Sequence, residues 1–196
     1  MSYEAVPDGE LAAIVTYLEM CAPPDQEIPP APLFLKRVEV PEPKHYKELF
    51  RLIGAPWLWF SRLILDDAHL ASIIQHPRVE LDVVLDEADR EVGILELDLR
   101  EPQECELSFI GLIPELSGKG HGRWLIAEAV HRAWREGVDR VHVHTCSLDH
   151  PAALEAYRRA GFTPYKRAIE RFPDPRLLGI LPRDSAPQIP LLGTLA

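Results

Sequence analysis

The sequence predicts an α/β fold in which a mixed, mainly antiparallel sheet carries helices on both faces. Three short apolar, β-branched runs separated by polar turns between residues 79 and 113 are typical of an antiparallel meander. Two amphipathic segments with helical spacing, one on each side of that meander, are each followed by a glycine. A further strand-like run and a short helix come later in the chain. At 196 residues the chain suits one domain with a proper core.

The first forty residues are predicted to form two strands joined by a proline-rich connector. Residues 11–20 are β-branched and aromatic in their second half, which favours a strand, with an N-terminal helix as the alternative. The prolines of residues 21–32 exclude a regular helix or a central strand there. Residues 33–40 are the second strand candidate.

Two helices are expected before the meander. Pro43 opens the first, Gly54 is placed to end it, and its apolar positions have i, i+3, i+4, i+7 spacing: Tyr46, Leu49, Phe50 and Ile53. Asp66 or Asp67 caps the second, which Pro77 stops. An aromatic cluster with Trp57 and Trp59 lies between them. We interpret these rings as core anchors, with a wall of a substrate site as the alternative.

The remaining elements follow from the same signals. The meander strands are residues 79–85, 92–99 and 106–113. A helix with a buried stripe at Ile126, Ala129, Val130 and Ala133 is ended by Gly137, and residues 140–146 form a strand. Asp149 or His150 begins a short helix that Gly161 closes, and residues 162–172 are the last strand. Residues 173–196 contain five prolines and are expected to trail over the surface, with residues 177–181 docking as an edge as the alternative.

Charge and cysteine content limit the kinds of partner and the cellular compartment that we expect. The net charge of −10 argues against a nucleic-acid partner, which needs a clustered cationic surface, and suits a cationic or neutral substrate. Cys21, Cys105 and Cys146 are odd in number and have no zinc or redox spacing, which favours a reduced, cytoplasmic compartment. No basic start with an apolar run and no stretch of 18 apolar residues is present, so we expect no membrane partner. A homodimer is left open.

A glycine-rich loop is the most informative stretch of the chain. The strand at residues 106–113 leads through Pro114 into Ser117-Gly118-Lys119-Gly120-His121-Gly122-Arg123 and the long helix. Glycines at alternate positions let a ligand approach the backbone, and a helix start offers unpaired N–H groups to an anion. The loop is therefore predicted to hold phosphate.

Two common phosphate-binding motifs do not fit this loop. A Walker A motif needs four residues between its first glycine and Gly-Lys-Ser/Thr, which the spacing from Gly118 to Gly120 does not provide. A dinucleotide fingerprint needs Gly-x-Gly-x-x-Gly and an acidic end to the next strand, whereas this strand ends at Thr145 and Cys146. A tight turn alone would explain one or two of the glycines.

Residues 113–125 resemble the acetyl-CoA loop of the GNAT superfamily of N-acetyltransferases, with Ser117 where that loop usually begins with Arg or Gln. Residues 150–162 resemble the second signature of the family, Asn-x-x-Ala-x-x-x-Tyr-x-x-x-Gly-Phe, with His150 in place of Asn. The resemblance covers residues 33–172, so the strand at 11–20 and the proline-rich tail are expected to lie outside the common core. It implies a sheet that is splayed near Gly111, with acetyl-CoA entering the split.

The resemblance also implies a mechanism and a cofactor site. Backbone groups at Leu112 and Ile113 would pair with the pantetheine arm and polarise the thioester carbonyl. The pyrophosphate would lie on the loop, whose candidate binding residues are Ser117, Gly118, Lys119, Gly120, His121, Gly122 and Arg123. Tyr157 matches the family's general acid, and a structural tyrosine is the alternative. His150 is interpreted as a helix-start residue, with contact to CoA as the alternative.

The general base is not specified by the motifs. Glu96 and Glu106 lie on strands joined by a turn and could approach each other, which would raise the proton affinity of one carboxylate; surface strand carboxylates are an equal alternative. His142, His144 and Cys146 share one strand face, but their spacing fits no zinc site and the chemistry needs no metal. We assign His142 to packing, and His144 and Trp57 to the acceptor side.

The predicted function is transfer of an acetyl group from acetyl-CoA to a primary amine of a small molecule. A non-catalytic acyl-CoA-binding module and a nucleotide-binding protein are the alternatives. The first would be indifferent to Tyr157→Phe, and the second would ignore CoA.

Overall fold

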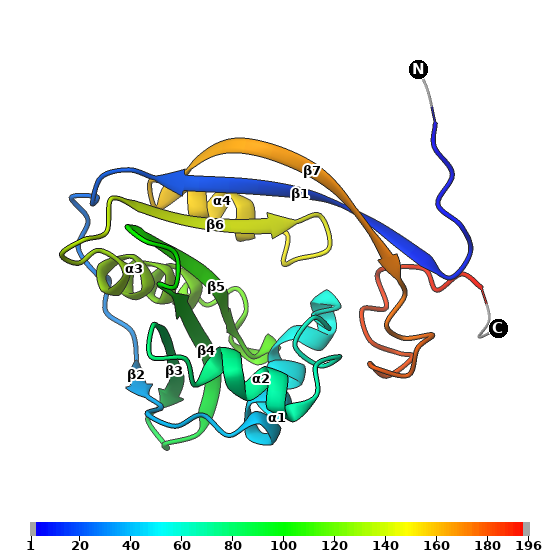
Figure 1. Cartoon of the computed structure of the whole chain (residues 1–196), viewed down its shortest axis with the longest axis horizontal. Helices are drawn as coiled ribbons and strands as arrows, with labels where there is room; N and C mark the ends of the chain where they lie inside the picture. Colours follow the sequence, from blue (N-terminus) through cyan, green and yellow to red (C-terminus); the bar gives the residue numbers. More distant parts are fainter. Residues whose placement is uncertain (1–2, 194–196) are drawn as a thin grey trace.

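The strands of the computed structural model, which describes residues 3–193, form a mixed sheet in the order β2-β3-β4-β5-β6-β1-β7 (Figure 1). Every neighbouring pair is antiparallel except β5 with β6, so the predicted fold class is confirmed. The strands are β1 (Glu10–Met20), β2 (Leu33–Arg37), β3 (Val79–Asp86), β4 (Glu91–Asp98), β5 (Glu104–Leu112), β6 (Arg140–Cys146) and β7 (Thr163–Pro173). The helices are α1 (Pro43–Gly54), α2 (Asp67–Ile74), α3 (His121–Ala133) and α4 (Ala153–Arg159), with short 3-10 turns η1 (Ala55–Trp57) and η2 (Pro114–Leu116).

The two helices before the meander begin close to the positions predicted from sequence. Pro43 stands in the first turn of α1, where the side chain of Glu42 accepts hydrogen bonds from the backbone N–H groups of Lys44 and His45. Asp66 caps α2 by accepting from His69 N at 2.8 Å. Both helices bury their apolar stripes, so these two predictions are confirmed.

The helices cover opposite faces of the sheet. Side chains of α1 and α2 form one core with β3 and β4, including Phe50, Leu70 and Ile94. On the other face α3 forms the larger core with β4, β5, β6 and β1, including Leu97, Leu125 and Val143. The sheet therefore separates two layers that approach the same strands from opposite sides.

The parallel pairing of β5 with β6 stops early. It joins Glu104–Arg140, Cys105–Val141 and Glu106–His142, and beyond these residues the two strands separate. The register of β5 with β4 shifts at the same place, which leaves Ser108 as an extra residue, and such a bulge bends a strand. Gly111 lies in the part of β5 that has left β6, as expected for the splay. We call the space between β5 beyond Glu106 and β6 beyond His142 the strand gap.

Gly111 is required by close packing. A Cβ atom at this position would come within 2.8 Å of Ile53 Cγ2 and 3.1 Å of the Trp59 ring. The glycine thus lets α1 and the segment after it lie directly on β5, beside the strand gap.

β1 lies inside the sheet, between β6 and β7. Its Leu18 and Met20 are buried in the larger core. The strand predicted at residues 11–20 is present as β1, and its side chains are part of the hydrophobic core of this chain. Residues 21–32 form an irregular connector that crosses α3 on the way to β2 (Figure 1).

Several element limits differ from expectation. β2 ends at Arg37, before residue 40, and α3 ends at Ala133, before the predicted stop at Gly137. Trp134 adopts an extended conformation there, and its indole N–H points to the sulfur of Met20 at 3.3 Å. The helix thus ends at the residue whose ring contacts β1.

The segment after β7 is packed rather than trailing. Asp174 and Arg176 form an ion pair of 2.7 Å in which each side chain is 2% exposed. Arg176 also donates to the backbone oxygen of Ile189 at 2.9 Å. Leu181 and Ala186 pack against Leu58, so this C-terminal segment (residues 174–193) supports the loop that follows α1. Residues 194–196 of the predicted tail lie outside the described residues.

None of the helices between residues 3 and 193 has the length and apolar character needed to cross a membrane.

Candidate active site

The glycine loop (residues 117–123) begins α3 and borders open space. Gly118 and Gly120 have φ angles of +75° and +84°, a conformation that residues with a side chain rarely adopt. Gly120 is the N-cap of α3. A Cβ atom placed on Gly118, Gly120 or Gly122 would meet no other atom within 4 Å. Among residues 3–193 no side chain caps this end of α3, and of its first N–H groups Arg123 N donates to Gly120 O at 3.1 Å. The N–H groups before it can bind an anion. The geometry fits a bound phosphate.

The remaining loop residues surround this helix start. Ser117, Lys119 and Arg123 are exposed, and His121 is half-buried. Ser117 N donates to Pro114 O at 3.0 Å, so the position where the family has Arg or Gln is held through its backbone.

Leu112 and Ile113 lie at the end of β5, beside the loop. Leu112 pairs with Gly93, and Ile113 N donates to Val92 O at 2.9 Å, so both are bound to β4 on one side. The opposite edge of β5 faces the strand gap, because β6 is no longer paired there. This edge can accept an extended ligand by main-chain hydrogen bonds.

Tyr157 lies on α4, is 7% exposed and packs edge-to-face on Phe162 at 5.9 Å between ring centres. No hydrogen bond to its hydroxyl group is formed by the part of the chain that the structure describes. Burial, and to a smaller extent the charge of Asp149, raises the pKa of Tyr157. The phenol is therefore protonated at neutral pH and can donate.

Glu96 is completely buried on β4 and already has two partners. It accepts hydrogen bonds from Tyr46 Oη and Arg62 Nη2, both at 2.5 Å. The guanidinium of Arg62 also lies 5.0 Å from the centre of the Phe109 ring. Burial, together with the charge of Glu96, raises the pKa of Tyr46. The carboxylate is thus held in a charged, hydrogen-bonded cluster between α1 and the sheet.

Glu106 is paired with His144 across the start of the strand gap. Glu106 Oε1 lies 3.3 Å from His144 Nδ1, and both side chains are partly exposed. The hydrogen bond from His144 lowers the pKa of Glu106, and the same contact raises the pKa of His144. The predicted approach of Glu96 to Glu106, which would have raised the pKa of one carboxylate, does not determine the pKa of Glu106. Glu106 lies opposite Asp98 in the β4–β5 register, and its pKa is lowered rather than raised.

His142 and Cys146 lie on the same face of β6 as His144. His142 lies 3.4 Å from Glu104, and burial lowers its pKa. Burial raises the pKa of the Cys146 thiol to about 11. Within residues 3–193 no group of three or more histidine, cysteine, aspartate or glutamate side chains is arranged to hold a metal ion.

A hydrogen bond links the two sides of the strand gap. Trp59 Nε1 donates to Asp149 Oδ1 at 3.1 Å, while Asp149 Oδ2 accepts from Thr145 Oγ1 and Cys146 N, each at 2.8 Å. The Trp59 ring rests on Phe109 of β5, with 5.5 Å between ring centres. Asp149 follows β6, so the contact joins the separated ends of the diverging strands.

Trp57 and His150 reinforce this link. Their rings meet edge-to-face with 5.0 Å between centres. His150 Nδ1 also accepts from Ala152 N at 3.1 Å, in the turn before α4. The helix itself begins at Ala153 with Ala152 as its N-cap, so the predicted start at Asp149 or His150 is wrong by a few residues. Sequence reasoning considered Asp149 only as a helix cap and Trp59 only as an anchor or a wall, and it missed Arg62. The neighbouring aromatic run was the one available signal for Trp59.

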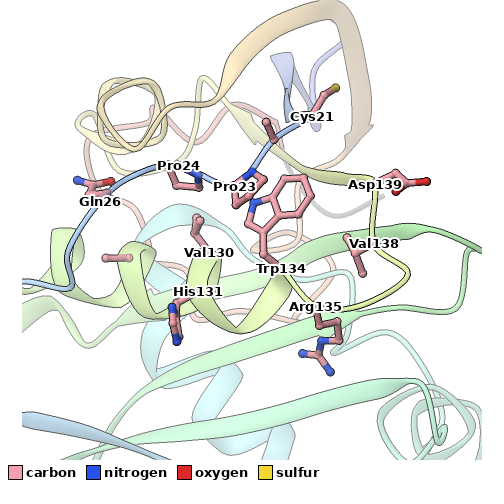
Figure 2. Close-up of a pocket in the computed structure, with 12 residues that line it drawn as sticks. Cys21, Pro23, Pro24, Gln26, Val130, His131, Trp134, Arg135, Val138 and Asp139 are labelled. Carbon is pink, nitrogen blue, oxygen red and sulfur yellow. The ribbon is translucent and has the colours of Figure 1, made fainter.

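A separate pocket of about 740 Å³ lies on α3, away from these groups. Figure 2 shows Pro23 and Pro24 of the connector facing Trp134 and Val130 of the α3 region, with Arg135 and Asp139 nearby. None of the predicted site residues lines it. The pocket lies between the connector and α3, and none of its lining residues belongs to the glycine loop.

Known proteins with related sequences and structures identify the family. The model of the acetyltransferase (GNAT) family matches residues 46–162. A GCN5-related N-acetyltransferase from Sphaerobacter thermophilus has a TM-score of 0.60 at 18% identity, over 82% of this chain and 51% of that one. The chain thus spans about half the length of that protein. No curated protein matches the sequence.

Two enzymes with named substrates have similar folds. The aminoglycoside acetyltransferase meta-AAC0020, from an uncultured soil metagenomic sample and in complex with sisomicin, has a TM-score of 0.56 at 20% identity, over 71% of this chain and 93% of that one. Spermidine N-acetyltransferase from Vibrio cholerae, in complex with CoA and spermine, has a TM-score of 0.56 at 19% identity, over 73% and 96%. The family model matches more than half of the chain, at residues 46–162, and this match shows that the chain belongs to the acetyltransferase (GNAT) family.

Proposed function

We propose that the protein transfers the acetyl group of acetyl-CoA to a primary amine of a small molecule. The observation that carries this proposal is the position of the uncapped start of α3, with its three open glycines, beside the unpaired edge of β5. An anion site and an extended backbone edge at one place match the pyrophosphate and the pantetheine arm of CoA.

The chain has suitable groups for each part of this ligand. N–H groups of residues 118–123 would bind the pyrophosphate, and the side chains of Lys119 and Arg123 add positive charge nearby. Leu112 and Ile113 would pair with the pantetheine arm along β5. His150, at the start of α4, is a further candidate contact. Acetyl-CoA would supply an acetyl group that is activated as a thioester.

Two groups are proposed to move protons. The Tyr157 hydroxyl, protonated and without a partner among the described residues, would donate a proton to the leaving thiolate. The Glu106–His144 pair would take the proton of the amine, directly or through water. We place this pair ahead of Glu96 as the base, because Arg62 and Tyr46 already occupy the Glu96 carboxylate.

The acceptor would enter on the α1 side, where Trp57 and Trp59 form a wall against residues 149 and 150. The acidic chain, with a net charge of −10, suits a cationic amine. Similar folds that act on aminoglycosides and on spermidine support this class of acceptor.

Calorimetry followed by a thiol-release assay tests the proposal. We expect one site for acetyl-CoA and no comparable heat with ATP or NAD; absence of acetyl-CoA binding would refute it. Release of free thiol should then be compared across polyamines, aminoglycosides, amino acids and simple amines.

Tyr157→Phe separates an enzyme from a binding module. The variant should keep its affinity for acetyl-CoA, whereas turnover should fall by about 10²-fold or more, as for other general acids. Tyr3→Phe, at a position 93% exposed, is the matched control. Unchanged turnover in Tyr157→Phe would exclude the proposed acid.

A further inference from the structure

Strand β7 is an open edge of the sheet. It pairs with β1 on one side and ends the strand order, and Figure 1 shows it as the outermost strand. Most of its residues are exposed on both faces. Such an edge carries a row of unpaired N–H and C=O groups that can pair with another strand.

Exposed apolar side chains accompany this edge. Ile169 is 77% exposed, and its partner across the β1–β7 ladder, Ile14, is 56% exposed. The two isoleucines share one face of the sheet, because facing residues of antiparallel strands point the same way. A second strand beside β7 would cover part of this pair.

We propose that β7 pairs with β7 of a second copy of the chain, antiparallel and with Ala168 on the two-fold axis. A two-fold axis perpendicular to the sheet makes such a contact self-complementary. Facing residues in an antiparallel pair either both direct their N–H and C=O groups toward the partner strand or both direct them away. Because this direction alternates along a strand, facing positions of two identical strands differ by an even number of residues. The axis therefore passes through the same residue of each strand, and the charges of β7 determine which residue that is.

Charges select the register. An axis at Lys166, Arg167 or Glu170 places that residue opposite itself, and an axis at Ile169 places Arg167 opposite Arg171 of the second copy. Each of these registers contains like charges face to face, which is destabilising. An axis at Ala168 instead places Lys166 opposite Glu170 twice and Arg167 opposite Ile169 twice. It is the one arrangement centred between residues 166 and 170 that has only favourable charge pairs.

The same register brings the apolar side chains together. Ile169 faces Arg167 of the second copy, so the two Ile169 residues are diagonal neighbours on one face, within reach of large side chains. Pro164 and Pro173, which have no N–H group to donate, lie outside the central pairs. The dimer would join the two sheets into one continuous sheet.

Charge reversal tests the register. The wild-type chain should be dimeric in sedimentation equilibrium, and Lys166→Glu or Glu170→Lys should each raise the dimer dissociation constant at least about tenfold, because each creates two like-charge pairs. An equimolar mixture of the two variants should form heterodimers, and the double variant should regain the homodimer. Lys36→Glu, on the opposite edge strand β2, is the control and should stay dimeric.

Cross-linking measures the axis position. In a Cys21→Ser background, Ala168→Cys should form an intermolecular disulfide, because facing Cα atoms lie about 4.5–5.5 Å apart in an antiparallel pair. Glu170→Cys should not, because the two copies of that residue are four positions apart along the strand. A monomeric wild-type chain, single reversals that stay dimeric, or preferential cross-linking through residue 170 would each overturn the proposal. Circular dichroism melts confirm that each variant is folded.

Discussion

Replacement of Asp149 by alanine should both destabilise the protein and remove the hydrogen bond that links the two sides of the strand gap. The carboxylate accepts three hydrogen bonds, from Trp59 Nε1, Thr145 Oγ1 and Cys146 N. Its removal leaves these donors without their acceptor, and Thr145 is only 5% exposed. Hydrogen bonds to a charged group are worth about 1.5–3 kcal/mol each when buried. Because Asp149 is half-buried and the three bonds share one group, we expect a total loss of about 2–4 kcal/mol.

Chemical denaturation and thermal melting measure this loss. For a chain of this size each kcal/mol corresponds to a Tm shift of about 2–4 °C, so a loss of about 2–4 kcal/mol should make Asp149→Ala melt roughly 4–16 °C lower. Asp149→Asn keeps an acceptor oxygen and should lose about 1 kcal/mol. Glu155→Ala is the matched control on α4, because its exposed ion pairs with Arg158 and Arg159 are worth less than about 1 kcal/mol.

A double-mutant cycle isolates the contact that crosses the gap. Asp149→Ala and Trp59→Phe should be coupled by about 0.5–2 kcal/mol, since they remove two ends of one hydrogen bond. The acceptor KM should rise in both variants, with little change in acetyl-CoA affinity. Coupling near zero, or an Asp149→Ala variant as stable as the control, would show that the link does not hold the gap.

Three further predictions concern the glycine loop and two ion pairs. Gly120→Ala should lower the free energy of unfolding by about 1 kcal/mol because its φ is positive, whereas Gly122→Ala should not; equal melts would contradict this. Glu106→Gln should lower the pKa of His144 toward about 6.5 in an NMR titration. The raised pKa of His144 gives the folded protein extra stability below the ordinary histidine pKa, and this stability is lost as pH rises through the raised pKa. The variant should therefore lose stability mainly under mildly acidic conditions. The hydrogen bond from Arg135 lowers the pKa of Glu80 to about 2, so its contribution is present above about pH 4.5 and lost as pH falls toward 2; Glu80→Gln should flatten the acid branch of the stability curve, and an unchanged branch would refute this.

The helices and the meander could be predicted from sequence because their signals are local. Pro43, Gly54 and Asp66 mark helix ends through backbone conformation and capping, and these act within a few residues. The end of α3 could not be predicted in this way. Gly137 is a good local stop, but the helix ends at Ala133, and the next residue, Trp134, contacts Met20, which is far away in sequence.

The place of β1 depends on the assembled sheet. Residues 11–20 indicate a strand but not its neighbours, and their position between β6 and β7 follows from long-range pairing. The order of the C-terminal segment was missed for a related reason. Its prolines exclude regular structure, but the buried Asp174–Arg176 pair gives it a fixed irregular conformation.

Part of the candidate site could be predicted from sequence. Motif spacing placed the glycine loop at the start of α3 and Tyr157 on α4, and the structure has both on these elements. The partners of Glu96 and Glu106 could not be predicted from sequence. Arg62, which contacts Glu96, lies in a loop, and His144, which contacts Glu106, lies on another strand. The proposal of the Glu106–His144 pair as proton acceptor therefore rests on a contact between two strands.

Amide chemical shifts during titration with acetyl-CoA test the central proposal most directly. We expect the largest changes at Gly118, Gly120 and Arg123, together with Leu112 on β5, because these N–H groups border the loop and the strand gap. Changes concentrated instead at the connector and Trp134, around the pocket in Figure 2, or no saturable change at all, would contradict it.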